Sequence, residues 1–184
     1  MGEYLFQTFA QENIAPFEEI NFQRIITLCT QGLNTLRQEY PALGGEFTVL
    51  HASEFLFEAL SSLAPESGGM LDQWGTLTFH DSCYLGRYQQ IYREPRSVLR
   101  NAGLQLTEMS ASGDDSLCCG GGGGAMWLET DPETRVNRKR LEQAQEIKAD
   151  TVATACPYCL IMLDDAVRSQ GLGEEIQVLD LAEL

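Results

Sequence analysis

The sequence predicts an α/β fold in which a parallel sheet lies between layers of crossover helices, as in Rossmann-like domains. Two observations support this fold class. Short apolar runs alternate along the chain with segments of helical periodicity, and that alternation is typical of parallel sheets joined by crossover helices. The cysteine motifs also follow predicted strands. They should therefore lie at the carboxyl ends of the strands, where open α/β sheets bind their ligands.

Six apolar runs are expected to be strands, because each is four to six residues long and lies between segments of turn-forming or helical pattern. They cover residues 23–28, 47–50, 76–80, 104–109, 151–155 and 176–179. Together they would supply the strands of the sheet.

Apolar periodicity predicts helices over residues 33–40, 53–60, 88–92, 95–102, 125–148 and from Cys159 to about 169. Pro41 should stop the first helix, and Ser53 is a candidate N-cap for the second. Asp131-Pro132 suggests a fresh first turn within the long region 125–148. Residues 65–69 are expected to form a loop and to mark a boundary.

Charge and hydropathy exclude several classes of protein. Twelve basic residues against 27 acidic ones give a net charge of −15, which argues against binding to nucleic acid or to anionic lipid. No apolar run approaches the roughly 20 residues of a membrane span. The N-terminus lacks the basic and apolar regions of a signal peptide. We therefore expect a cytoplasmic protein that associates with a membrane only through partners or through regions outside this chain.

Five cysteines form the pattern that carries most chemical information. Cys83 is followed after 34 residues by Cys118-Cys119-Gly120, and after 35 more by Cys156-x-x-Cys159. Neighbouring cysteines rarely satisfy disulfide geometry, whereas two adjacent thiolates can reach different atoms of a polynuclear metal centre. A zinc site needs four ligands, so a set of five favours an iron–sulfur cluster.

Three alternatives remain open for these cysteines. Four of them could close a zinc site in a structural or assembly module, leaving one spare. Cys156 and Cys159 could form a thioredoxin-like dithiol pair. A disulfide framework is the third alternative, although a reducing cytosol disfavours it.

Gly120, Gly121 and His80 are the candidate cofactor-binding residues that are not metal ligands. A glycine backbone can approach sulfide closely and present its N–H groups, and a helix starting near Ala125 would add its positive dipole end. The alternative is that residues 122–124 form only a flexible hinge. His80 could hydrogen-bond a thiolate or relay a proton, or it could be an ordinary histidine satisfied at a strand end. Trp127, just beyond the glycines, is expected to pack in the core.

A partial internal repeat divides the chain. Residues 26–36 resemble residues 153–163, and residues 49–55 resemble residues 178–184. Cys29 aligns with Cys156, but Gly32 stands where Cys159 stands in the second copy. A single cysteine cannot hold a cluster, so Cys29 is expected to be a structural thiol. The counterparts of Cys83 and of the cysteine pair would lie before Met1, which suggests a fragment or a shortened form of a longer protein.

The motifs HDSCYLGR, SLCCGGGGGAMW, TRVNRKR and ATACPYCLIML resemble those of the cysteine-rich CCG domain. This domain occurs in heterodisulfide reductase, in the iron–sulfur subunit of glycolate oxidase and in related oxidoreductases that link flavoproteins to quinones. The resemblance covers residues 76–184. It implies that residues 69–184 are a complete second CCG domain and that residues 1–68 are the C-terminal part of a degenerate first copy.

The resemblance also implies an electron-transfer function. The cofactor would be a 4Fe-4S cluster, of non-cubane form in heterodisulfide reductase, while some family members hold zinc in one copy. The partners would be flavoprotein or ferredoxin-like redox subunits. The implied ligands are Cys83, Cys118, Cys119, Cys156 and Cys159. The first copy lacks a Cys-x-x-Cys motif, so one cluster is expected rather than two.

Overall fold

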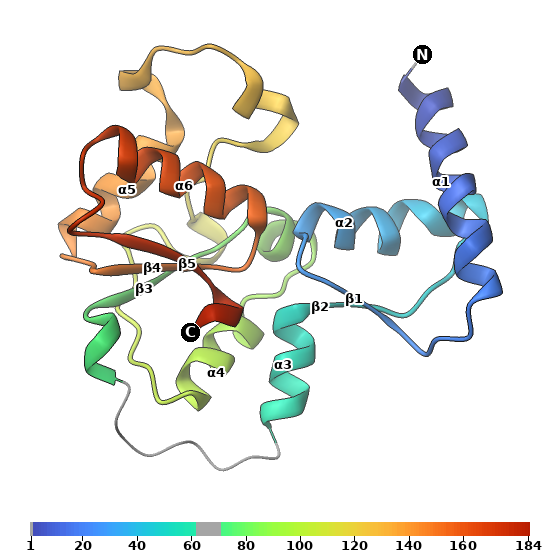
Figure 1. The fold of residues 1–184 in the computed structure, drawn as a ribbon, viewed down its shortest axis with the longest axis horizontal. Helices are drawn as coiled ribbons and strands as arrows, with labels where there is room; N and C mark the ends of the chain where they lie inside the picture. Colours follow the sequence, from blue (N-terminus) through green and yellow to red (C-terminus); the bar gives the residue numbers. More distant parts are fainter. Residues whose placement is uncertain (1, 62–70) are drawn as a thin grey trace.

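The computed structural model describes residues 2–61 and 71–184 and forms a mixed α/β structure with parallel strands (Figure 1). Strand β1 (Ile25–Thr27) pairs with β2 (Val49–His51). Strand β4 (Thr151–Thr154) lies between β3 (Leu77–His80) and β5 (Gln177–Asp180) in a second sheet. The predicted α/β class with parallel pairing is confirmed, although the strands form two small sheets.

Helices cover both sides of the strand layer. Helices α2 (Thr30–Asn34), α5 (Val136–Glu146) and α6 (Pro157–Ser169) lie on one side in Figure 1, and α3 (Ala52–Leu60) and α4 (Arg93–Asn101) lie on the other. Every residue of β3 and of β4 is buried. Burial on both faces is expected of parallel strands that are covered by helices.

Two apolar clusters form most of the core. One lies between the strands and α3 and α4, and its buried residues come from both halves of the chain, including Leu33, Phe79 and Leu99. The other packs α5 and α6 against β4 through residues such as Leu141 and Leu163. The two halves therefore share a core.

Several short helical turns connect these elements. Helix α2 continues into a π-helical turn, Thr35–Glu39, and a 3-10 turn, Tyr40–Leu43. A second π-helical turn, Tyr84–Tyr88, directly follows Cys83, and such turns are frequent at functional sites. Further 3-10 turns cover Leu71–Trp74, Gly113–Asp115, Gly122–Trp127, Pro132–Thr134 and Leu181–Glu183.

The predicted strand 104–109 is wrong except at one residue. Leu106 forms an isolated parallel bridge with Leu77. Two residues further on, Glu108 forms an ion pair with Arg96 of α4. The chain here is held by one backbone hydrogen bond to β3, from Thr107 N–H to the Leu77 carbonyl, and by the side-chain partner in α4.

The predicted helical region 125–148 is also shorter than expected. Gly123 and Gly124 have φ angles of 63° and 78°, in the left-handed region where an α-helix cannot continue. Asp131 begins a short turn in which its side chain accepts a hydrogen bond from the backbone N–H of Glu133. Arg135 is extended, so α5 begins only at Val136.

Two features near the N-terminal half differ from the prediction. Helix α1 (Gly2–Glu19) was not expected, and it packs Ala10 and Ile14 against Tyr40. The N-cap of α3 is His51 rather than Ser53, because the His51 ring accepts the Ser53 backbone N–H. The expected loop and boundary at residues 65–69 lie outside the described residues.

The two segments of the internal repeat share local geometry. Cys29 is the N-cap of α2 after β1, and Cys156 is the N-cap of α6 after β4. After β2 and β5, His51 and Asp180 each form a capping box with the glutamate three residues on. The same strand-to-helix junctions therefore occur at corresponding positions.

Candidate metal centre

The first part of the site lies at the carboxyl end of β3. His80 is the last residue of the strand and is completely buried, and Cys83 follows at the start of the Tyr84–Tyr88 turn. Between them, the buried Asp81 carboxylate accepts two hydrogen bonds from Arg96, at 2.6 and 2.8 Å. It also accepts the backbone N–H of Gly113 at 2.8 Å. Asp81 thus fixes the loop that leads to the cysteine pair.

The cysteine pair lies on that loop rather than on a strand. Arg87 holds the loop by donating hydrogen bonds to the backbone carbonyls of Asp114 and Ser116. Gly120 then adopts a φ angle of 80°, which L side chains rarely adopt, and its N–H donates to Cys118 Sγ at 3.3 Å. Next to it, a Cβ atom at Gly121 would lie 2.9 Å from the Met162 side chain. Both glycines allow the backbone to turn tightly beside the sulfurs.

The Cys-x-x-Cys motif is on the first turn of α6. Cys156 is its N-cap, Pro157 occupies the first turn and Cys159 points from the same end of the helix. Both cysteines are buried. The positive end of a 13-residue helix therefore faces the site and favours negative charge there. This helix takes the role that was expected of a helix near Ala125, where only a 3-10 turn forms.

The five sulfurs form one continuous network. Each thiol affects the proton binding of the next, so that Cys83 is linked to Cys118, Cys118 to Cys119, Cys119 to Cys159 and Cys159 to Cys156. Three segments that are distant in sequence thus bring their thiols together, with Tyr158 and Met162 packed against them.

Proton sharing within the network shifts the thiol pKa values in opposite directions. The pKa of Cys118 is lowered by the hydrogen bond from Cys119 and then by that from Cys83. The pKa of Cys156 is lowered to about 5, chiefly by the hydrogen bond from Cys159. The pKa values of Cys83 and Cys159 are raised, because their thiols donate. A metal would replace these shared protons, since thiolates are the metal-binding form.

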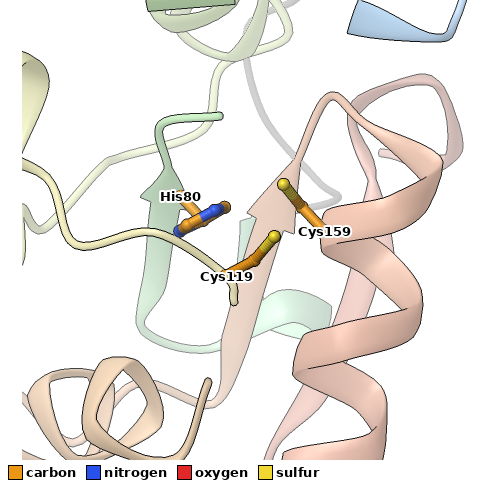
Figure 2. A group of neighbouring side chains, drawn as sticks. All are labelled: His80, Cys119 and Cys159. Atoms are coloured by element: carbon orange, nitrogen blue, oxygen red, sulfur yellow. The ribbon is translucent and has the colours of Figure 1, made fainter. Parts of the chain in front are cut away.

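His80 faces the same space (Figure 2). One of its ring nitrogens and the sulfurs of Cys119 and Cys159 lie within 4.8 Å of one another. Burial, and then the charge of Arg140, lowers the pKa of His80 to about 3, so the ring is neutral at physiological pH. Its Nε2 atom is buried and has no hydrogen-bond partner among the described residues.

Thr30 contributes to the site from the first half of the chain. Its hydroxyl donates to Cys156 Sγ at 3.2 Å and shares a 3.1 Å hydrogen bond with Ser82. Sequence analysis missed Thr30, and the only available signal was its position beside Cys29 in the repeat. Cys29 itself caps α2, with its sulfur accepting the Gly32 N–H at 3.3 Å.

A cavity of about 490 Å³ borders the site. It adjoins Gly120 and Met162 and is lined mainly by apolar side chains, together with Arg135, whose guanidinium pairs with Asp165 at 3.4 Å. Trp127, which was expected to pack in the core, is 80% exposed at this cavity. The left-handed glycines before it direct the chain outward instead of into a helix.

Comparisons with known proteins find several relatives of this chain. The chain is 39% identical over its full length to a probable iron-sulfur-binding oxidoreductase, FadF, of Bacillus subtilis, of which it covers 26%. It is 35% identical over its full length to EtfAB:quinone oxidoreductase of Syntrophomonas wolfei, again covering 26%. One of the subunits of the dihydromethanophenazine:CoB–CoM heterodisulfide reductase of Methanosarcina barkeri is 28% identical over 95% of this chain, which covers 43% of that relative.

The chain thus spans about a quarter of the length of the first two relatives. Residues 77–164, which contain all five cysteines of the network, match the model of the cysteine-rich domain named CCG. The chain therefore carries a cysteine-rich CCG domain over residues 77–164.

Proposed function

We propose that this chain is an electron-transfer part of an iron–sulfur oxidoreductase and holds one 4Fe-4S cluster. Its ligands would be Cys83, Cys118, Cys119, Cys156 and Cys159. The observation that carries the proposal is the series of these five neighbouring thiols, of which Cys119, Cys156 and Cys159 are buried. When bound, the cluster would supply one-electron transfer, and a non-cubane form would use the fifth thiolate.

The donor set fits such a cluster. Five thiols exceed the four ligands of a tetrahedral zinc ion, and iron–sulfur clusters are held by thiolates. The buried Nε2 atom of His80 and the N–H of Gly120 add hydrogen-bond donors, which suit an anionic group. Two of the relatives are named for iron–sulfur binding or quinone reduction, and zinc has no support from them. These points favour the cluster over a zinc-stabilised assembly module.

The chain's own residues would shield and tune the cluster. Tyr158 and Met162 pack against the sulfurs and exclude water. The N-terminus of α6 and the Thr30 hydroxyl stabilise negative charge on Cys156. Exclusion of water and hydrogen bonds to the sulfurs both affect the reduction potential of a cluster, so these neighbours would set its potential.

The redox partners would be flavoprotein or ferredoxin-like subunits. The name of one relative, EtfAB:quinone oxidoreductase, pairs a protein called EtfAB with quinone. Since the chain covers only part of its relatives, the substrate and the complete electron path belong to the whole protein. Within the described residues, no helix is both long and apolar enough to cross a membrane. From the sequence we propose a cytoplasmic location, with any membrane association made through partners or other regions.

We further propose that residues 69–184 are a complete CCG domain and that residues 1–68 are the end of a degenerate first copy. The matching strand-to-helix junctions at Cys29 and Cys156 support this division. In this organisation the first copy has lost its own cluster and supplies Thr30 to the second.

Anaerobic reconstitution with iron and sulfide tests the proposal. We expect about four irons per chain, a broad visible absorption that decreases on reduction, and re-oxidation by a flavoprotein or quinone acceptor. A colourless protein with one zinc per chain, unchanged by iron and sulfide, would support the zinc-stabilised module instead.

A further inference from the structure

Arg140 is a buried cation beside the site, and it is not one of the proposed metal ligands. It is 1% exposed and lies on α5, inside the second half of the chain. Its Nε–H donates to His80 Nδ1 at 3.1 Å. Its Nη1 donates to the backbone carbonyl of Ala111 at 2.6 Å and to Gln143 Oε1 at 2.7 Å. The guanidinium is therefore fixed by neutral acceptors.

This cation forms no direct ion pair, although the charges of Asp81 and Glu108 act on it from a longer distance. Within residues 2–61 and 71–184, no carboxylate lies at ion-pair distance from Arg140, and its Nη2 atom has no hydrogen-bond partner. A buried charge without a directly paired counter-charge is destabilising. An anionic metal–sulfur group near Cys159 would provide the missing negative charge.

The contact with Arg140 also fixes the tautomer of His80. A guanidinium can only donate, so Nδ1 of His80 must be the acceptor. The neutral ring then carries its proton on Nε2, which is buried and has no partner among the described residues. The ring lies beside the sulfurs of Cys119 and Cys159, with one of its nitrogens within 4.8 Å of them. Metal binding would need a lone pair on Nε2, but that lone pair is absent in this tautomer. His80 can therefore donate a hydrogen bond and cannot serve as a sixth ligand.

We propose that Arg140 holds His80 in the Nε2–H tautomer, and that this N–H donates to sulfur at the Cys119 and Cys159 side of the cluster. His80 and Arg140 are positioning residues that set the reduction potential and do not complete the ligand set. This inference rests on the proposed function. A hydrogen bond and a buried positive charge both favour the more negative, reduced state of a cluster, so the pair raises its potential.

The test compares reconstituted wild type with His80→Phe, which keeps a ring but removes the donor, and with Arg140→Met, which removes the charge and the Nδ1 contact. We expect iron content equal to wild type in both variants and a lower reduction potential in both. His80→Gln, which retains an N–H group, should recover part of the shift. Arg138→Met is the matched control, because it removes a cation from the same helix that pairs with an exposed glutamate. Its potential should equal that of wild type.

Electron–nuclear double resonance on the reduced wild-type cluster gives a readout that needs no variant. We expect a weakly coupled exchangeable proton, absent in His80→Phe, and no strongly coupled nitrogen. A strongly coupled nitrogen, loss of iron in His80→Phe, or an unchanged potential in both variants would overturn the inference while leaving the proposed cluster intact. A wild-type chain that takes up no cluster would overturn the proposed function itself.

Discussion

Replacing Asp81 with asparagine tests how the loop that carries the cysteine pair is held. The Asp81 side chain is 3% exposed and pairs with Arg96, whose side chain is 12% exposed. It accepts three hydrogen bonds, two from Arg96 and one from the backbone of Gly113. Asparagine keeps the shape but turns one acceptor oxygen into an NH₂ group that faces donors.

The cost follows from this geometry. At least one charge-assisted hydrogen bond is lost, worth roughly 1.5–3 kcal/mol, and the half-buried guanidinium loses its main counter-charge. Breaking a buried pair costs about 3–5 kcal/mol. Arg96 keeps its second partner, Glu108. We therefore expect Asp81→Asn to lower the free energy of unfolding by about 3 kcal/mol, at the lower end of that range.

Urea unfolding of the metal-free chain, kept reduced, measures this loss without a contribution from metal binding. Glu133→Gln is the control, because Glu133 forms a similar ion pair with Arg138 but is 74% exposed. The control should lose less than about 1 kcal/mol. If Asp81→Asn and Glu133→Gln lost equal stability, the Asp81 network would not hold the loop.

Three further predictions concern the site. Thr30→Val should lower the free energy of unfolding by about 1 kcal/mol, because a buried hydrogen bond is lost. The control Thr8→Val, on the exposed face of α1, should leave the free energy of unfolding unchanged. Urea unfolding measures both variants. Gly120→Ala should destabilise the folded chain by about 1–2 kcal/mol, because Gly120 has a positive φ, and it should weaken iron retention. Gly122 lies in open space with an ordinary φ, so Gly122→Ala should change neither stability nor iron retention. For His80, burial lowers the pKa to about 3 from the ordinary value of 6.5. Between pH 6.5 and pH 3 the His80 ring binds a proton in the unfolded chain but stays neutral in the folded chain. His80 therefore lowers the free energy of unfolding by about 1.4 kcal/mol for each pH unit as the pH decreases from 6.5 toward 3. His80→Gln should remove that part of the slope in urea unfolding at several pH values.

Each of these predictions has a clear contrary result. Equal stability of Thr30→Val and wild type would mean that the first half of the chain does not support Cys156. If Gly120→Ala and Gly122→Ala changed stability and iron retention equally, the left-handed turn at Gly120 would not be needed to shape the site. An unchanged pH slope in His80→Gln would mean that the ring is not buried in neutral form.

Much of the fold could be predicted, because periodicity and turn residues are local signals. Five of the six predicted strands form, and two of them, β3 and β4, are buried at every residue although both contain threonine. The run 104–109 failed because its neighbours in space, Leu77 and Arg96, decide whether it pairs. The division into two small sheets likewise depends on tertiary packing, which no local pattern encodes.

The site shows the same division between local and tertiary information. The spacing of the cysteines along the chain is typical of metal ligands, so they could be predicted as ligands from the sequence. Thr30 carries no such signal, because a threonine after a strand is usually an ordinary residue. Arg140 belongs to the motif TRVNRKR, but the motif does not say which of its basic residues is buried. Only their burial and their contacts with Cys156 and His80 identify them. Trp127 was misplaced because the conformation of the preceding glycines is set by the loop.

The central claim is that one cluster is held by five of the six cysteines and not by Cys29. The most direct measurement is iron and acid-labile sulfide per chain after anaerobic reconstitution of wild type, Cys29→Ser and Cys119→Ser. We predict about four irons and a matching amount of sulfide in wild type and in Cys29→Ser, with a marked loss in Cys119→Ser. Loss of iron in Cys29→Ser, or full retention in Cys119→Ser, would contradict the account.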